Sequence, residues 1–162
     1  RLFRSRYPNA RFAGIDISAT FLHLAAENCR ELGVDVELFL ADARDSDAMR
    51  AHDVDFVIMS IFTHHLKPFE LYALLSKIAI YAKKAVFIVD VRRDFRNIVK
   101  TALFSAFNFG SSADFRHDAL LSLRRAFTPR EIQWILERVD GLTEVDVKPL
   151  DQVFVMAKAS VH

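Results

Sequence analysis

Two adjacent histidines follow a short apolar segment in the first half of the chain. The segment Val54 to Met59 is apolar apart from one aspartate and is rich in β-branched residues, which is typical of a strand covered on both faces in a parallel α/β sheet. Polar side chains begin directly after it, at Ser60, Thr63, His64 and His65. A neutral imidazole is suited to general base catalysis near pH 7. His64 and His65 are therefore the candidate catalytic residues.

Neighbouring side chains on an extended chain point in different directions. We therefore expect one of the two histidines to face a ligand and the other to pack or cap the following helix, and the sequence leaves open which. The pair is a poor metal site, because no carboxylate or cysteine stands at ligand spacing. We expect no metal.

Two aspartates stand at further expected strand ends. Asp16 is the last residue but one of the segment RFAGIDI, and Asp42 follows the segment Val34 to Leu40. Ligands bind at the carboxyl ends of strands in open α/β sheets, so both carboxylates are candidate ligand-binding groups. A structural alternative stays open for each. Asp16 could cap the next helix or interact with the dipole of that helix, and Asp42 could form an Asx-turn.

The elements that would position these residues alternate in type. Strands are expected at Arg11–Ile17, Val34–Leu40, Val54–Met59 and Ala85–Val91. Helices are expected between Ser18 and Gly33, in a short polar stretch at 45–51, and from Pro68 to Tyr81, after which Lys83-Lys84 would turn the chain. Such alternation predicts a parallel sheet with right-handed crossovers.

The second half of the chain follows a different pattern. A helix is expected to begin at Asp94, and the capping box Thr128-Pro129-Arg130-Glu131 is expected to begin another. Two strands, Leu142–Val147 and Val153–Ala157, have a short connection and are expected to form an antiparallel hairpin. With no repeat or linker, the chain is expected to be a single domain over residues 1–162.

Composition narrows the class of protein. The chain has 162 residues, of which 52% are apolar and 27% charged, a balance typical of one globular domain. A net charge of +1 does not favour nucleic acid as a partner. The single cysteine, Cys29, excludes an internal disulfide and fits a reducing cytoplasm. No apolar run approaches the roughly 20 residues that span a bilayer, and no signal peptide is visible.

The chain resembles class I S-adenosylmethionine-dependent methyltransferases, of the small-molecule branch that includes quinone-biosynthesis enzymes. The resemblance covers nearly the whole chain. It rests on GIDIS (14–18), ADARD (41–45), DFVIMSIFTHHL (55–66) and RRAFTPREI (124–132). It implies an α/β, Rossmann-like parallel sheet with a C-terminal antiparallel hairpin. It also implies S-adenosyl-L-methionine as cofactor and a small-molecule acceptor, and a homodimer is compatible with it.

The resemblance also implies roles for individual residues. The cofactor-binding residues would be Asp16, Ile17, Asp42, Ala43, Ser60 and Ile61. Asp16 would bind both ribose hydroxyls, because a carboxylate can accept two charge-assisted hydrogen bonds. Asp42 would contact the adenine amino group beside the backbone of Ala43. Ser60 and Ile61 would border the methionine part of the cofactor and the transferred methyl group.

A helical lid would cover the acceptor in this family, and Arg92 to Arg125 occupies its place. The segment is rich in phenylalanine, which suggests an apolar acceptor, although ordinary helical core is the alternative. Phe107, Arg116 and His117 would line the acceptor pocket.

The chain departs from the family at the glycine-rich turn after the first strand. Its four glycines, at 14, 33, 110 and 141, do not form such a turn. By family order, the first strand is missing and would lie between the strands ending at Asp16 and Ser60. We expect the parent protein to supply it upstream, and the alternative is an incomplete fragment that is inactive alone. Two other functions stay open: a nicotinamide-dependent oxidoreductase, whose ribose would also need a strand-end acid, and a non-catalytic binding or dimerising module.

Overall fold

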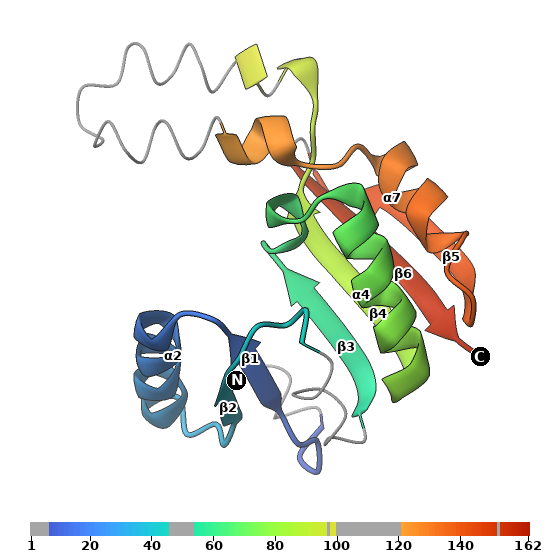
Figure 1. Cartoon of the computed structure of the whole chain (residues 1–162). Helices are drawn as coiled ribbons and strands as arrows, with labels where there is room; N and C mark the ends of the chain where they lie inside the picture. Colours follow the sequence, from blue (N-terminus) through green and yellow to red (C-terminus); the bar gives the residue numbers. More distant parts are fainter. Residues whose placement is uncertain (1–6, 46–53, 97, 100–120, 152) are drawn as a thin grey trace. The chain divides into compact units, whose positions relative to one another are not determined.

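The computed structural model describes residues 7–45, 54–96, 98–99, 121–151 and 153–162. The chain divides into two compact units, Arg1–His52 and Asp53–His162, which we describe separately (Figure 1). The prediction of a single domain stays a prediction.

The first unit contains two short parallel strands and one helix. Strand β1 is Ala13–Asp16, helix α2 is Ala19–Glu31 and strand β2 is Glu37–Leu40. The strands pair in parallel, from Ala13 opposite Glu37 to Asp16 opposite Leu40. Both strands lie inside the predicted segments but are shorter. Their parallel pairing brings both carboxyl ends to one edge of this unit.

Helix α2 begins and ends where the sequence predicts. The Ser18 hydroxyl accepts a hydrogen bond from the Phe21 backbone N–H at 3.3 Å, which satisfies one donor of the first turn. Gly33 has a φ of 63°, a left-handed conformation that glycine adopts without steric cost and that commonly ends helices. No described residue of this unit is buried. The apolar side chains among residues 7–45 therefore form no buried core within the unit.

The second unit contains a four-stranded mixed sheet and its helices. Its elements are β3 (Val54–Ser60), the 3₁₀ turn η1 (Thr63–His65), α4 (Pro68–Tyr81), β4 (Ala82–Val91), α7 (Pro129–Leu136), β5 (Leu142–Pro149) and β6 (Phe154–Val161). The strand order is β3-β4-β6-β5. Strand β3 runs parallel to β4, and β6 runs antiparallel to both β4 and β5. The predicted C-terminal hairpin is confirmed, and β6 inserts between β5 and β4.

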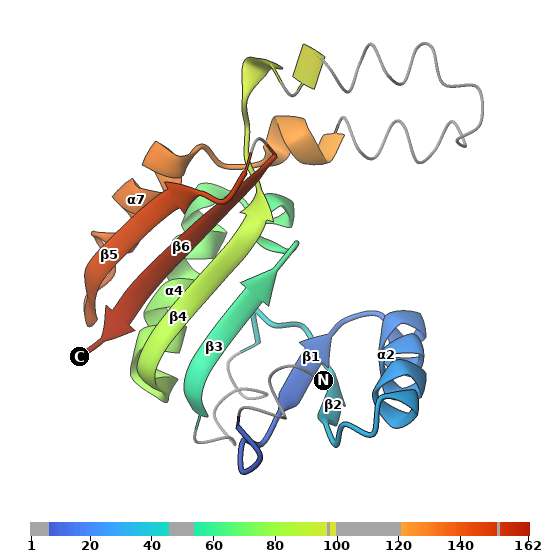
Figure 2. The ribbon, with the colours of Figure 1, turned by 180° about the vertical axis from the view of Figure 1, so that it is seen from behind.

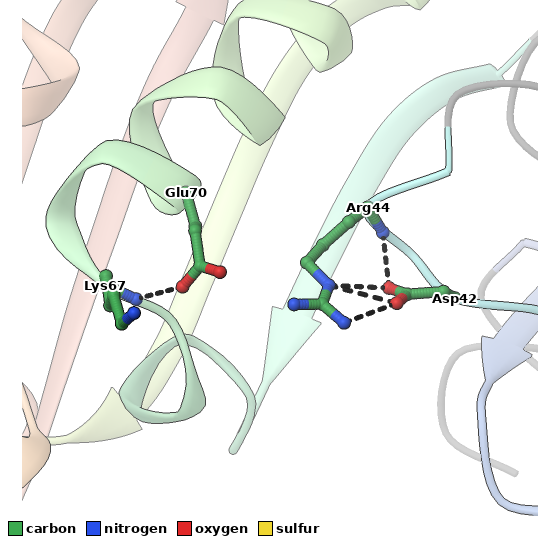
Figure 3. Close-up of polar contacts among 4 residues, drawn as sticks. All are labelled: Asp42, Arg44, Lys67 and Glu70. Carbon is green, nitrogen blue, oxygen red and sulfur yellow. Dashed lines mark hydrogen bonds and ion pairs between the residues drawn. The ribbon is translucent and has the colours of Figure 1, made fainter.

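Two helix starts of this unit follow their sequence signals. Pro68 opens α4, and the Glu70 carboxylate accepts a hydrogen bond from the Lys67 backbone N–H at 2.7 Å (Figure 3). At α7 the Thr128 hydroxyl accepts from the Glu131 N–H, and the Glu131 carboxylate accepts from the Thr128 N–H. The predicted capping box is therefore confirmed.

The core of the second unit lies between its sheet and the two helices α4 and α7. Both helices lie on the same face of the sheet, and the opposite face carries no described helix of this unit (Figures 1 and 2). The fully buried side chains include Leu71, Leu75, Ile78, Val86, Ile88, Ile132, Leu136 and Val155. Burying a side chain of this size contributes about 1.5–3 kcal/mol, so this layer holds the sheet in place.

Two expectations about the strands of this unit are wrong. Lys83 and Lys84 do not turn the chain, because β4 begins at Ala82, directly after α4. They lie in the exposed start of the strand, where the Lys84 ammonium pairs with Asp55 at 2.9 Å. Strand β3 is not covered on both faces: Phe56 is 53% and Ile58 62% exposed, because the described helices α4 and α7 pack on the opposite face of the sheet.

Several expectations fall outside the described residues. These are the polar stretch at 45–51 apart from its first residue, most of the lid expected from Arg92 to Arg125, and the acceptor-pocket candidates Phe107, Arg116 and His117. Among the described residues, no helix is both long and apolar enough to cross a membrane.

Candidate functional site

The loop after β3 and the end of β4 meet at one edge of the second unit. The two strands run in parallel, with Ser60 opposite Val89, so both deliver polar residues to the same edge. The Ile61 N–H donates to the Val89 carbonyl at 2.9 Å, which extends the pairing by one residue. The chain then turns through η1 towards α4.

A buried carboxylate, Asp90, organises this edge. It is 1% exposed. Its Oδ2 accepts hydrogen bonds from the Thr63 hydroxyl at 2.6 Å, the His64 N–H at 3.1 Å and the Phe62 N–H at 3.2 Å. Its Oδ1 lies 2.8 Å from His64 Nδ1 and accepts from the Val91 N–H at 2.7 Å. One side chain of β4 therefore holds the whole turn that follows β3.

The Asp90 carboxyl is ionised at neutral pH. Burial raises its pKa, but the hydrogen bonds from His64 and Thr63 outweigh that effect and hold the pKa below its usual value. An ionised carboxylate only accepts hydrogen bonds, so the His64 Nδ1 carries the proton of this contact. In the neutral ring, Nε2 is then the unprotonated nitrogen.

The second ring nitrogen of His64, Nε2, is not part of the contact with Asp90. Every fully buried side-chain nitrogen and oxygen in the described part of the chain has a hydrogen-bond partner. None of the described residues supplies a partner to His64 Nε2, although the residue as a whole is 4% exposed. In the tautomer that donates its Nδ1–H to a carboxylate, Nε2 is the nitrogen that can accept a proton, which is the arrangement of a general base.

His65 differs from its neighbour in exposure. Its side chain is exposed, and its ring centre lies 4.0 Å from that of His64 at an interplanar angle of 41°. Partial burial and the neighbouring His64 lower the pKa of His65, so its ring is neutral at pH 7. The two histidines thus have distinct surroundings, and which of them acts in catalysis stays a prediction.

Ile61 adopts an unusual backbone conformation beside this network. Its φ is 51°, in the left-handed region that β-branched residues rarely adopt. The side chain is 48% exposed. Ser60 is exposed as well, so both predicted cofactor-contacting residues of this unit are accessible.

In the first unit, Asp16 stands at the end of β1 with one carboxylate oxygen engaged. Oδ1 accepts from the Ser18 N–H at 2.7 Å, which forms a local turn. Ser18, and not Asp16, caps helix α2, so the bond is not the helix cap considered for Asp16. No described residue donates to Oδ2, and the neighbouring Ile17 is 70% exposed. The carboxylate can therefore still accept hydrogen bonds from a diol while its own orientation is fixed by the turn.

Asp42 has a different environment at the end of β2. Its carboxylate accepts from the Arg44 N–H at 2.9 Å, from Arg44 Nε at 3.0 Å and from Arg44 Nη2 at 2.6 Å (Figure 3). The Arg44 side chain is the main cause of a lowered pKa for Asp42. The Asx-turn considered for Asp42 is present, and any ligand of Asp42 must share the carboxylate with Arg44. Ala43, between the two, is half-buried.

Three of these residues were not singled out from the sequence for their roles: Asp90, Thr63 and Arg44. Asp90 carried a usable signal, because an aspartate inside the apolar run AVFIVDV must find partners once it is buried. Nothing in the sequence indicates that those partners lie on the loop after β3. No three histidine, cysteine, aspartate or glutamate side chains of the described ranges converge as a metal site.

The amino-terminal half of the chain matches a known family. A family model described as a methyltransferase domain matches residues 1–85, which is more than half of the 162 residues. The chain belongs to the methyltransferase domain family. The match includes the strand ends that carry Asp16 and Asp42 and the loop that carries the histidine pair.

Solved structures of methyltransferases share the fold of this chain. A protein assigned as an O-methyltransferase from Nostoc punctiforme is 22% identical, with a TM-score of 0.70, over 97% of this chain and 46% of its own. An O-methyltransferase family 2 protein from Planctomyces limnophilus, in complex with apigenin, is 21% identical, with a TM-score of 0.66, over 98% of this chain and 45% of its own.

A magnesium protoporphyrin IX methyltransferase from Synechocystis with bound S-adenosylhomocysteine is 14% identical, with a TM-score of 0.62, over 96% of this chain and 65% of its own. The chain thus spans about half the length of the first two structures. The comparison with curated proteins gave no match. The predicted family and the predicted methyltransferase-like α/β fold are confirmed.

Proposed function

We propose that this chain forms part of an enzyme that transfers a methyl group from S-adenosylmethionine to a small, largely apolar acceptor. The observation that carries the proposal is the match of residues 1–85 to the methyltransferase domain. S-adenosylmethionine supplies a methyl group on a positively charged sulfur, which is already reactive towards a nucleophile. The protein's contribution is then to bind the cofactor, to align the acceptor and to take up its proton.

The Oδ2 of Asp16, to which no described residue donates, supports a role in cofactor binding. A ribose presents two neighbouring hydroxyl groups, and an ionised carboxylate accepts hydrogen bonds from both with charge assistance. Because Oδ1 is held by the Ser18 N–H, the side chain is already oriented before a ligand binds. Ile17, exposed beside it, offers an apolar surface to the same part of the cofactor.

In this proposal, other residues bind the adenine and methionine ends of the cofactor. Asp42 would accept from the adenine amino group alongside Arg44, next to the backbone of Ala43. Ser60 and Ile61 would border the methionine part, and both are accessible at the carboxyl end of β3.

Either histidine of the loop could take the acceptor's proton. The ring of His64 is held by Asp90 through Nδ1, and His65 is the more exposed ring and is neutral at pH 7. Support for His64 is stronger, because a base whose orientation is fixed by a carboxylate loses little freedom when it reacts.

Phe107, Arg116 and His117 remain the proposed acceptor-pocket residues. Two further proposals from the sequence are a cytoplasmic location and a homodimer.

Calorimetric titration of the intact protein with S-adenosylhomocysteine, and separately with NAD, tests the function. We expect S-adenosylhomocysteine to bind and NAD not to bind. Binding of NAD alone would favour the oxidoreductase, and binding of neither would remove both enzymatic functions.

The substitution Asp16→Ala tests the ribose site. We expect the Kd for S-adenosylhomocysteine to rise by about 10- to 100-fold, because hydrogen bonds to charged groups contribute about 1.5–3 kcal/mol. Asp35→Ala is the matched control: Asp35 is an exposed aspartate of the same unit that precedes β2, away from the strand's carboxyl end. An unchanged Kd in Asp16→Ala, with the protein folded, would show that the ribose binds elsewhere.

A further inference from the structure

The left-handed conformation of Ile61 needs an explanation, because it is costly for this residue type. At a φ of 51° the Cβ atom crowds the backbone, and the β-branched side chain makes the crowding worse. Strained backbone persists only where the surrounding structure imposes it, and it is concentrated at binding and catalytic sites. The strained residue here is half-exposed, so packing of its own side chain in a core does not impose the strain.

The hydrogen bonds on either side of Ile61 impose it instead. Before the turn, the Ile61 N–H is held by the Val89 carbonyl of β4. After the turn, the Phe62 N–H, the Thr63 hydroxyl and the His64 N–H all donate to Asp90 Oδ2. Both acceptors lie on adjacent residues of β4. The chain therefore leaves β3, reverses at Ile61 and is held again on the same neighbouring strand.

We propose that Asp90 is a positioning residue that holds Ile61–His64, the anchored loop, in the conformation that binds the cofactor. The proposal rests on the proposed function, because Ser60 and Ile61 are there assigned to the methionine end of S-adenosylmethionine. In this role Asp90 does not touch the cofactor. It acts through Thr63 and the backbone of the loop, and it shifts the population of the free protein towards the conformation that binds.

If Asp90 only stabilised the fold, neither a buried charge nor a strained turn would be required. Desolvating a carboxylate is expensive, and a buried ionic network is often no more stabilising than apolar side chains of similar size. A turn needed only for chain reversal could also carry glycine at position 61 and avoid the strain. A buried charge combined with a strained, accessible isoleucine indicates that a particular loop shape is maintained for a ligand.

The test uses Thr63→Val in the intact protein, with S-adenosylhomocysteine as the probe in calorimetry. Valine keeps the size of the side chain but removes the hydroxyl that donates to Asp90. We expect the apparent Kd to rise by about tenfold, because it scales with the reciprocal of the fraction of protein in the competent conformation. Thr63→Ser keeps the hydroxyl and is expected to stay within about threefold of the original protein.

Thr128→Val is the matched control. Thr128 also bonds a carboxylate through its hydroxyl, at 3.0 Å to Glu131, but it caps α7 and is not part of the anchored loop. We expect its Kd to be unchanged. All titrations are made at a temperature where circular dichroism shows each variant fully folded.

Combining Ile61→Gly with Thr63→Val changes the Kd for S-adenosylhomocysteine in a way that a purely structural role of Asp90 would not. Glycine takes a φ of 51° without a Cβ penalty, so the loop needs less help from Asp90 to reach its shape. Because Ile61 is itself assigned to the cofactor site, the double variant is compared with Ile61→Gly alone, and we expect Thr63→Val to raise the Kd by less than about threefold in that background. Asp90→Asn, which keeps the side-chain size but loses one acceptor oxygen, is the second route, with the same direction of effect and the same smaller effect in the Ile61→Gly background.

The outcomes separate this inference from the proposed function. If the unmodified protein does not bind S-adenosylhomocysteine, the proposed function fails first. If it binds and Thr63→Val or Asp90→Asn binds equally tightly while folded, Asp90 is not a positioning residue. A rise in Kd on Thr63→Val that is equally large in the Ile61→Gly background would also overturn the proposal, because the strain would then be unrelated to binding.

Discussion

Asp42 and Asp90 occupy similar places in the chain but very different surroundings. Each stands where a strand of a parallel pair ends, and hydrogen bonds from a basic side chain and from backbone N–H groups lower the pKa of each. Asp42 has its donors on Arg44, two residues away, and the Arg44 side chain is 51% exposed. Asp90 is 1% exposed, and its donors on the loop are 26 to 28 residues away.

The difference follows from the two units in which they lie. No described residue of the Arg1–His52 unit is buried, so its polar contacts are local and remain in contact with water. The Asp53–His162 unit has a core between its sheet and α4 and α7. A low dielectric strengthens the hydrogen bonds of Asp90 and makes each unpaired group there costly. A carboxylate with similar donors therefore forms a local turn at Asp42 in the first unit. At Asp90 in the second unit it holds a loop that is distant in sequence.

Replacing each aspartate with alanine gives the largest expected contrast. In Asp90→Ala the Thr63 hydroxyl and the His64 Nδ1–H lose their acceptor inside the protein. We expect the free energy of unfolding to fall by about 3–5 kcal/mol, as for other broken buried charge networks. In Asp42→Ala we expect a loss of no more than about 1 kcal/mol, typical of exposed ion pairs.

Urea unfolding followed by circular dichroism measures both changes. Equal losses in the two variants would mean that Asp90 is as well hydrated as Asp42, and the contrast between the units would disappear.

Lowering the pH should reveal the same contrast between Asp90 and Asp42, with a smaller effect on the free energy of unfolding. A carboxyl whose pKa is lowered on folding stabilises the folded state above its unfolded pKa of about 4. That stabilisation is lost as the pH falls through the lower folded pKa, because the unfolded chain then binds the proton first. We expect the stability difference between the original protein and Asp90→Asn to shrink below about pH 4.

Unfolding curves recorded at pH 7 and at several values below 4 measure this effect, with Asp42→Asn as the comparison. Asp42→Asn should differ little from the original protein at either end of the range, because its ion pair is exposed. A stability difference for Asp90→Asn that is independent of pH would contradict an ionised Asp90.

The smallest effect is expected from the other partner of the exposed pair. Arg44→Gln removes the guanidinium from Asp42 but leaves the backbone N–H that forms the Asx-turn. We expect stability to change by no more than about 0.5 kcal/mol, as for most surface substitutions away from special features. A loss comparable with that of Asp90→Ala would show that Arg44 supports more than a local turn. Thermal unfolding monitored by circular dichroism is sufficient to detect it.

Local signals in the sequence predicted much of the fold. Ser18 and Gly33 bound α2, Pro68 opens α4, and Thr128 with Glu131 opens α7, because caps and fixed φ values act within a few residues. The strand interiors were recognisable from their apolar, β-branched runs. Their ends were not, and β4 incorporates Lys83 and Lys84 because a strand can begin in solvent wherever its backbone finds a partner.

The candidate site residues also divide into those that the sequence singled out and those that it did not. The sequence alone identified Asp16, Asp42 and the histidine pair, because strand-end acids and imidazoles are visible in a single segment. It also determined the resemblance to methyltransferases, which the family match confirms. It left open which histidine is buried, and the strain at Ile61 was not visible in it at all.

Only the tertiary structure decided those points. The pairing of β3 with β4 brings Asp90 against a loop far away in sequence, and burial turns that proximity into a network whose donors must all be satisfied. Residue types and their spacing determine which groups are available and where helices begin. Which groups meet depends on strand order and on water exclusion, and both exist only once the chain has folded.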